Sequence, residues 1–290
     1  MTDEHSKRST RDLLGPFPDA RILLDKYNLR AKKQFGQNFL ISDRAMRAIA
    51  DATVTSDEDW IVEIGAGLGT LTAQLVERVT AGKVIALEMD PDMVAVLRAE
   101  LGEVDNLEIE QIDAMRYDLK MVGRWRGDKI VVCGNLPYHI ASQLMFRVID
   151  AREVVKHCVV MIQKEMADRI VAVPGTKQYG AIGVMLRTYA DITTVIKVPA
   201  GSFLPPPKID STVIKLTPLA QPRTPVADEK HYSKVVHAGF GQRRKTLRNA
   251  LALICDEGSL RRIGIDPGLR GETLAVGEFV RIANALAAAQ

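Results

Sequence analysis

The sequence predicts an α/β protein with a mostly parallel sheet whose last strand is antiparallel, followed by a small all-α C-terminal domain. Apolar runs expected to be strands are DWIVEIGAG (59–67), KVIALEMD (83–90), LEIEQIDA (107–114), KIVVCGNLPY (129–138) and HCVVMIQK (157–164). Amphipathic segments such as residues 70–79 and 91–101 lie between them and are expected to be helices. Strands that are apolar on both faces and alternate with helices are typical of a parallel sheet covered on both sides.

The last two predicted strands are connected differently from the others. Residues 192–199 (ITTVIKVP) and 211–216 (STVIKL) are separated by AGSFLPPPKID, which leaves no room for a helix. A parallel crossover needs about a dozen or more residues, so we expect an antiparallel hairpin at the end of the sheet. Such an ending differs from the sheets that bind dinucleotides.

The chain divides into three predicted regions. Residues 1–24 form a polar extension, residues 25–220 hold the α/β domain, and residues 221–290 form the helical domain. Three prolines in LTPLAQPRTPVADEK (216–230) indicate a linker. The chain after this linker is expected to be wholly helical. One buried helical face is expected to contain Leu247, Ala250, Leu251 and Ile254.

Composition and charge set the broad class. The 290 residues, of which 47% are hydrophobic, are enough to bury a sizeable core. The net charge is only +3, but residues 26–47 hold six cationic side chains against one acid, and residues 230–248 hold six against none. Two basic segments on a nearly neutral chain indicate a polyanionic partner. Two solvated helix faces explain them equally well on charge alone.

The cysteines and the apolar runs indicate where the protein works. Cys133, Cys158 and Cys255 are odd in number and far apart, so we predict neither a disulfide framework nor a metal site. A reducing cytoplasm fits this pattern. The first twenty residues lack an apolar signal region, and no later apolar run is long enough for a membrane span. We therefore expect a soluble cytoplasmic protein without a membrane partner.

A glycine-rich loop follows the first predicted strand. VEIGAGLGTLT (62–72) places Gly65 and Gly67 where a backbone can approach a ligand closely. Glu88 ends the second strand, where it can accept hydrogen bonds from ribose hydroxyls, and Asp113 ends the third, where it can accept from an adenine amine. Thr70 occupies the position that a dinucleotide fingerprint gives to Gly or Ala. An adenosine ligand without a pyrophosphate fits better, and S-adenosylmethionine is the common one.

The fourth predicted strand ends in Asn135, Leu136, Pro137 and Tyr138, beside the expected methyl donor. The Asn135 amide oxygen and the Leu136 carbonyl can accept hydrogen bonds from an amino group, which turns its lone pair toward the methyl carbon. Pro137 would hold this geometry, and Tyr138 would stack on the base. No strong base is needed, because the proton can leave after transfer. An Asn that caps a turn beside a buried Tyr is the alternative.

Five motifs along the chain occur together: NLPY (135–138), GQNFL (36–40), MIQKEMADRI (161–170), FLPPPKIDSTVIKL (203–216) and QRRKTLRN (242–249). In combination they resemble the KsgA-type small-subunit rRNA adenine dimethyltransferases, from about residue 28 to the C-terminus. The resemblance implies a class I S-adenosylmethionine-dependent methyltransferase fold, with residues 25–220 as the methyltransferase domain. It also implies dimethylation at N6 of two adjacent adenosines in the 3′-terminal helix loop of small-subunit rRNA, late in assembly.

The resemblance and the motifs together assign the site. Cofactor contacts are expected from Asn38, Leu40, Gly65, Gly67, Glu88, Asp113 and Asn135. Base handling is expected from Asn135, Leu136, Pro137 and Tyr138, with Phe203 as the second aromatic face. RNA contacts are expected from Arg243, Arg244, Lys245, Arg248, Lys32 and Lys33. Arg244 and Arg248 are four residues apart, so on a helix they would share one exposed face.

Departures from the family pattern are small, namely Ala66 for a usual proline and His139 for Asn or Tyr. The expected partner is an immature 30S-type subunit, bound by a monomer. Three alternatives remain open: a large-subunit rRNA methyltransferase of the erythromycin-resistance type, a mainly RNA-binding assembly or transcription factor, and a DNA adenine methyltransferase. The intact NLPY argues for catalysis, and the short helical tail argues against the DNA enzyme.

Overall fold

The computed structural model describes residues 17–136 and 140–288 and contains two compact units. The first unit holds the described residues up to Lys164 together with Thr194–Leu216, and the second holds Glu165–Thr193 together with the residues from Thr217 onward. The predicted single boundary at residue 220 differs from this division. Residues 165–193 group with the C-terminal helices because Tyr179 and Val184 are buried in the hydrophobic core of that unit.

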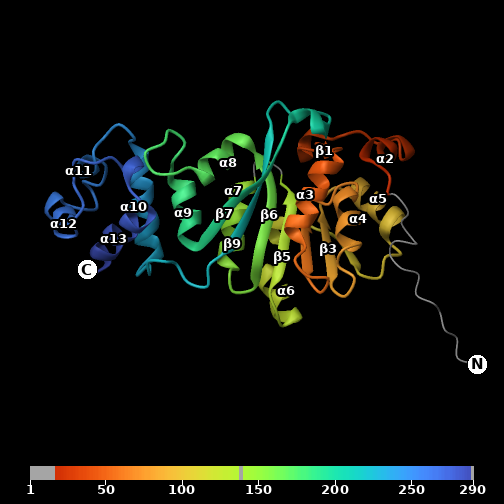
Figure 1. The fold of residues 1–290 in the computed structure, drawn as a ribbon, viewed down its shortest axis with the longest axis horizontal. Coiled ribbons are helices and arrows are strands. Elements are labelled where there is room, and N and C mark those ends of the chain that lie inside the picture. The colour runs from red at the N-terminus through yellow and green to blue at the C-terminus, as the bar shows by residue number, and fades with distance from the viewer. Residues whose placement is uncertain (1–16, 137–139, 289–290) are drawn as a thin grey trace, which may run out of the picture. The chain divides into compact units, whose positions relative to one another are not determined.

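A seven-stranded sheet forms the centre of the first unit (Figure 1). Its strands are β2 (Trp60–Ile64), β3 (Lys83–Glu88), β4 (Leu107–Gln111), β5 (Ile130–Asn135), β6 (Val155–Gln163), β7 (Ala190–Val198) and β9 (Ser211–Pro218). Their order is β4-β3-β2-β5-β6-β9-β7. The first five of these strands pair in parallel, and β9 pairs antiparallel with β6. The predicted fold class is therefore confirmed, although β9 lies inside the sheet, between β6 and β7.

Helices alternate with these strands, and capping residues set where they begin. They are α2 (Ala20–Lys26), α3 (Asp43–Thr53), α4 (Thr70–Val76), α5 (Pro91–Leu101), α6 (Leu119–Arg126) and α7 (Ala141–Asp150). The side chain of Asp90 accepts from the backbone N–H of Asp92 and Pro91 occupies the first helical position, so α5 begins directly after β3. Because α5 starts there, the chain end of β3 is held in one place.

A second, two-stranded sheet joins distant parts of the first unit. β1 (Phe39–Leu40) pairs antiparallel with β8 (Phe203–Leu204), and the 3₁₀ turns η1 (Lys33–Phe35) and η3 (Ala200–Ser202) precede these strands. Phe203 therefore lies opposite Leu40. This pairing fixes the connection between β7 and β9 to the segment before α3.

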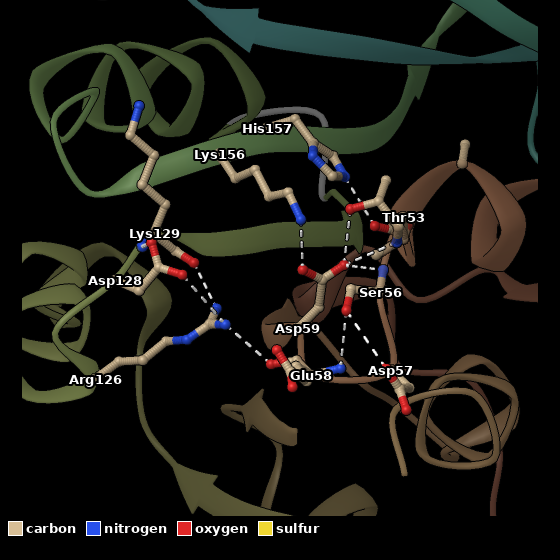
Figure 2. A network of polar contacts seen from close by, with 12 residues as sticks. Thr53, Ser56, Asp57, Glu58, Asp59, Arg126, Asp128, Lys129, Lys156 and His157 are labelled. Atoms are coloured by element: carbon tan, nitrogen blue, oxygen red, sulfur yellow. Dashed lines mark hydrogen bonds and ion pairs between the residues drawn. The ribbon is translucent and has the colours of Figure 1, made fainter. Parts of the chain in front are cut away.

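A polar network closes the end of α3 (Figure 2). The Nε2–H of His157, on β6, donates to the Thr53 carbonyl at 2.8 Å. The carboxylate of Asp59 accepts from the Thr55 and Ser56 backbone and from Lys156 Nζ at 2.8 Å. Burial, the largest effect, lowers the pKa of His157. This end of α3 is therefore held by a neutral imidazole.

The second unit is helical around its own core. Its elements are α8 (Lys164–Val171), α9 (Ala181–Tyr189), α10 (Glu229–Gly241), α11 (Leu247–Ala250), α12 (Glu257–Arg262), η4 (Gly271–Thr273) and α13 (Val276–Ala287). The ring of Phe240 stacks on Phe279 at 5.4 Å and meets Tyr179 edge-on at 5.6 Å. The Tyr179 hydroxyl donates to the Leu274 carbonyl at 2.8 Å, so its polar end is satisfied.

The expectation that the chain after the linker is wholly helical is wrong at residues 242–246, so Arg244 and Arg248 do not lie on one helix. α10 ends at Gly241, and Arg243, Arg244 and Lys245 lie in a turn before α11. The N–H of Leu247 donates to the Leu269 carbonyl at 2.7 Å, and the N–H of Arg248 donates to the Pro267 carbonyl at 3.1 Å. These tertiary bonds replace the helical ones.

Within the described ranges, the helices are too short or too polar to cross a membrane.

Candidate functional site

A cavity of about 260 Å³ opens at the carboxyl ends of β2, β3, β4 and β5 in the first unit. Its walls come from the loops after these strands and from the segment that leads into β1. The volume lies slightly below the ~300–1,000 Å³ that is usual for small-molecule sites. The predicted residues Asn38, Leu40, Gly65, Gly67, Glu88, Asp113, Asn135, Leu136 and Phe203 all line it.

The glycine loop after β2 forms one wall. Gly65 and Gly67 have φ angles of +70° and +58°, a backbone region that side chains disfavour. The N–H of Gly65 donates to the Leu87 carbonyl at 2.8 Å, which ties the loop to β3. A Cβ built on Gly65 would lie 3.7 Å from the Asn135 carbonyl oxygen, in the space between the loop and β5. That distance is an ordinary van der Waals contact, so the positive φ angles, and not a lack of space, favour glycine at these two positions.

Two carboxylates face the cavity from β3 and from the turn after β4. Glu88 Oε2 accepts from the Gly67 N–H at 2.8 Å, and Oε1 accepts from the N–H groups of Met89 and Asp90. A carboxylate has about four acceptor positions, so Glu88 keeps capacity for a ligand hydroxyl. Asp113 Oδ1 accepts from the Met115 N–H at 2.9 Å. Each carboxylate is thus oriented by backbone donors.

Asn135 lies at the end of β5 and lines the same cavity as Glu88. Gly134 precedes it, and a Cβ there would lie 2.3 Å from the Ile64 carbonyl oxygen, so only glycine lets β5 run this close to β2. The Asn135 Nδ2 donates to the Asn38 carbonyl at 3.2 Å. This bond assigns the amide orientation and leaves Oδ1 as the acceptor for a substrate.

Leu136 is buried, and its N–H donates to the Met161 carbonyl at 3.1 Å.

The aromatic part of the predicted site is described only in part. Phe203 is 3% exposed and lies in the cavity wall, where its pairing with Leu40 holds it. Pro137 and Tyr138 lie outside the described residues.

Sequence reasoning missed one buried acid in the cavity wall. Glu63 on β2 is 2% exposed, and its Oε2 accepts from the Thr72 hydroxyl at 2.6 Å. Burial, helped by the nearby charge of Glu88 and opposed by the Thr72 hydrogen bond, raises the pKa of Glu63 to about 8. The available signal was a single acid inside the apolar run WIVEI.

The residues predicted to contact RNA lie outside the cavity wall, and they differ in whether they are ion-paired. Arg244, Lys245 and Arg248 are exposed in the second unit. Arg243 also lies there, but it forms an ion pair with Glu272 Oε2 at 2.7 Å.

In the first unit, Lys32 Nζ lies 2.7 Å from Asp90 and 2.6 Å from Asp92, so its charge is offset within the chain. The side chain of Lys33 lies outside the described part.

The cavity suits the expected cofactor. S-Adenosylmethionine needs acceptors for ribose hydroxyls and for an adenine amine, and Glu88 and Asp113 offer these at neighbouring strand ends. Met89 and Ile112 add apolar surface beside them. Across the described ranges there is no group of three His, Cys, Asp or Glu side chains that could hold a metal ion.

Comparisons with known proteins agree with this geometry. A family model described as Ribosomal RNA adenine dimethylase matches residues 28–288. Ribosomal RNA small subunit methyltransferase A of Anaeromyxobacter sp. (strain K) is 41% identical over 284 residues, covering 93% of this chain and 98% of the relative. The protein of the same name from Xylella fastidiosa (strain Temecula1) is 39% identical over 259 residues, covering 89% of this chain and 97% of the relative.

The solved structures that resemble the chain include the following two. A dimethyladenosine transferase from Plasmodium falciparum has a TM-score of 0.71 at 25% identity, covering 84% of this chain and 95% of that one. The 23S rRNA methyltransferase ErmE has a TM-score of 0.68 at 23% identity, covering 86% and 100%, and this likeness concerns the fold alone.

Proposed function

Because this chain belongs to the ribosomal RNA adenine dimethylase family, we propose that it dimethylates N6 of two adjacent adenosines in the 3′-terminal helix loop of small-subunit rRNA. One observation carries the proposal: the Asn135 amide shares a cavity with two carboxylates suited to adenosine, and its oxygen is left as an acceptor. The names of the curated relatives support a small-subunit substrate. The large-subunit alternative rests on a likeness of fold alone.

The chemistry follows from the residues around the amine. S-Adenosylmethionine supplies an electrophilic methyl group. Asn135 Oδ1 and the Leu136 carbonyl accept hydrogen bonds from the adenine N6 amine, so its lone pair leaves conjugation and points at the methyl carbon. The proton then leaves to solvent. Phe203, and Tyr138 beyond the described residues, would hold the base between two aromatic faces.

We propose that Glu88 and Asp113 hold the adenosine part of the cofactor. The three backbone donors on Glu88 make its carboxylate rigid before binding, so little freedom is lost when a ribose hydroxyl binds. The glycine loop, Asn38 and Leu40 complete the wall.

The exposed cations of the second unit are proposed to bind rRNA phosphates within an immature 30S-type subunit. Arg244, Lys245 and Arg248 are the candidates, and the chain would act as a cytoplasmic monomer. Changing these three residues to Gln should weaken binding to immature subunits and flatten its dependence on salt. Arg261→Gln with Arg262→Gln, which removes two exposed cations from α12, is the control; Arg261 is ion-paired with Glu257 at 2.7 Å, so Arg262 carries the comparison.

The decisive experiment measures the product. Mass spectrometry of small-subunit rRNA should find dimethyladenosine in cells with the gene and not in cells without it. The purified protein should also methylate small subunits taken from the deletion strain, and not large subunits. An unchanged dimethyladenosine level in the deletion strain would contradict the proposed function. Methylation of large subunits alone would contradict it as well.

A further inference from the structure

A path of three hydrogen bonds, joined by covalent links within Asp90 and from Gln37 to Asn38, runs from Glu88 to Asn135. Its first step is at β3, where Glu88 Oε1 accepts from the N–H of Asp90 at 2.8 Å. The side chain of Asp90 then reaches back to the segment before β1: its Oδ2 accepts from Gln37 Nε2 at 2.7 Å. The carbonyl of Asn38, the next residue, accepts from Asn135 Nδ2. The ribose acceptor and the catalytic amide are thereby linked through Asp90 and Gln37.

Asp90 is held as a charged group despite its burial. Its side chain is fully buried, and Oδ1 accepts from Lys32 Nζ at 2.7 Å and from the Asp92 N–H at 3.1 Å. Burial opposes ionisation, but the hydrogen bonds from Lys32 and Gln37 outweigh it and hold the pKa of Asp90 below its ordinary value. A buried carboxylate that loses such a partner is strongly destabilised. Moving Gln37 away from the Asp90 carboxylate therefore costs free energy of folding.

The segment from Lys32 to Asn38 is also held by hydrogen bonds between its own residues. Gln37 Oε1 accepts from the Lys32 N–H at 2.8 Å, so the Gln37 side chain uses both ends of its amide. Gly36 has a φ of +63°, and its carbonyl accepts from Asn38 Nδ2 at 3.0 Å. With these bonds in place, the position of the Asn38 carbonyl depends directly on where Asp90 holds Gln37.

We propose that Asp90 and Gln37, supported by Lys32, are positioning residues that hold the Asn135 amide in its catalytic orientation. The inference rests on the proposed function, since it takes Asn135 as the group that accepts from the adenine amine. With the Asn38 carbonyl in place, the amide presents Oδ1 to the substrate. When the carbonyl moves, the amide is free to rotate and to present Nδ2, which repels the amine. Lys32 thereby gains a role other than the RNA contact that its charge indicated.

The chain contains a natural control for this idea. Lys26 Nζ and the Tyr27 hydroxyl both bind Glu100 at 2.5 Å, which docks the preceding helix α2 on α5. This contact uses the same two parts of the chain as Lys32 and Asp90. It includes none of the residues that connect Glu88 to Asn135. A variant that weakens only docking can therefore be compared with one that disturbs the connection.

The test exchanges the two partners. Asp90→Asn places an amide opposite the Gln37 amide, and Gln37→Glu places a carboxylate opposite the Asp90 carboxylate. The double variant restores the hydrogen bond, with residue 90 as the donor and residue 37 as the acceptor. Each single variant should lose roughly tenfold or more in kcat on small subunits, with the cofactor Kd within about threefold of wild type. The double variant should recover most of the loss, and Lys26→Met should keep wild-type kcat. Because Asp90 also caps α5, Gln37→Glu tests the idea if Asp90→Asn fails to fold.

A second readout does not depend on turnover. In protein labelled with ¹⁵N-asparagine, the Asn135 side-chain amide resonance should shift in Gln37→Glu, return in the double variant and stay in place in Lys26→Met. An unmoved resonance with normal kcat overturns the inference, as does an equal fall of kcat and cofactor affinity in Gln37→Glu and Lys26→Met. If wild-type protein does not methylate small subunits, the proposed function fails, and the resonance still decides this inference.

Discussion

Glu63→Gln isolates the buried acid of the cavity wall. The pKa of Glu63 is raised from 4.5 to about 8, mainly by burial, so the folded protein keeps a proton that the unfolded chain releases. A raised pKa adds stability that is complete below about 4.5 and is lost as the pH rises through about 8. The loss is about 1.4 kcal/mol for each pH unit inside that window. Glutamine has the shape of the protonated acid and does not titrate.

The expected result is a change in slope. Between pH 6.0 and 7.5 the wild-type protein should lose about 2 kcal/mol of unfolding free energy through this one group. The introduced glutamine keeps an oxygen for the Thr72 hydroxyl, so the variant should match wild type only below about pH 4.5. It should be more stable than wild type by about 2 kcal/mol at pH 6.0 and by about 4 kcal/mol at pH 7.5. Taking the difference between the two proteins removes the contribution of His157 and of the buried cysteines, which both proteins share.

Urea unfolding followed by tryptophan fluorescence is the suitable assay. The chain has two tryptophans, Trp60 and Trp125, and both belong to the first unit, with ring centroids 5.2 Å apart. The signal therefore reports on the unit that contains Glu63. Glu103→Gln, which removes an exposed carboxylate of the same unit, is the matched control. Parallel curves of unfolding free energy against pH for wild type and Glu63→Gln would refute the reasoning.

Three further outcomes are expected. Asn135→Ala should lower methyl transfer roughly a hundredfold, because one transition-state hydrogen bond of about 3 kcal/mol is lost; near-normal single-turnover rates would remove Asn135 from the mechanism. Glu88→Ala should weaken cofactor binding by about 1.5 to 3 kcal/mol for each ribose hydrogen bond, and calorimetry with an unchanged Kd would contradict this. Burial lowers the pKa of His157 from 6.5, so unfolding free energy should fall as the pH drops below about 6.5; His157→Gln should reduce that decline in urea titrations, and an identical decline would exclude His157 as its source.

Most of the sheet, and the meeting of several predicted site residues in one cavity wall, could be predicted because their signals are local. An apolar run followed by glycines marks a strand end, and the ends of parallel strands meet at one edge. Glu88, Asp113 and Asn135 were therefore placed together correctly. The pairing of β1 with β8 could not be found in this way. Each strand has two residues, too few for any periodicity, and the partners are far apart in sequence.

The division into units was harder to predict for a similar reason. Residues 165–193 have ordinary helical patterns, and only the packing of Tyr179 against Phe240 shows which core they join. The turn at 243–245 directly follows Gly241, where α10 ends, and this glycine was a local helix-end signal that the sequence analysis did not use. The N–H groups of Leu247 and Arg248 then donate to the loop at 267–269, which holds the start of α11 in place. Tertiary contacts with residues far away in the sequence can determine the structure of a segment without leaving a pattern in that segment's own residues.

Counting cations along the sequence also does not show which of them are already ion-paired within the chain. This pairing lowers the number of cations that the salt dependence of RNA binding should report. Of the predicted RNA contacts, Lys32 is offset by Asp90 and Asp92, and Arg243 is offset by Glu272. A phosphate would have to compete with these carboxylates, so such side chains add little to counterion release. Among the predicted contacts whose side chains the structure describes, three exposed cations remain: Arg244, Lys245 and Arg248. At roughly 0.7 to 0.9 for each neutralised phosphate, replacing all three should reduce the salt slope by about 2 to 3. Adding Arg243→Gln should leave that slope nearly unchanged, and a further drop of a full phosphate would show that RNA displaces Glu272 from Arg243.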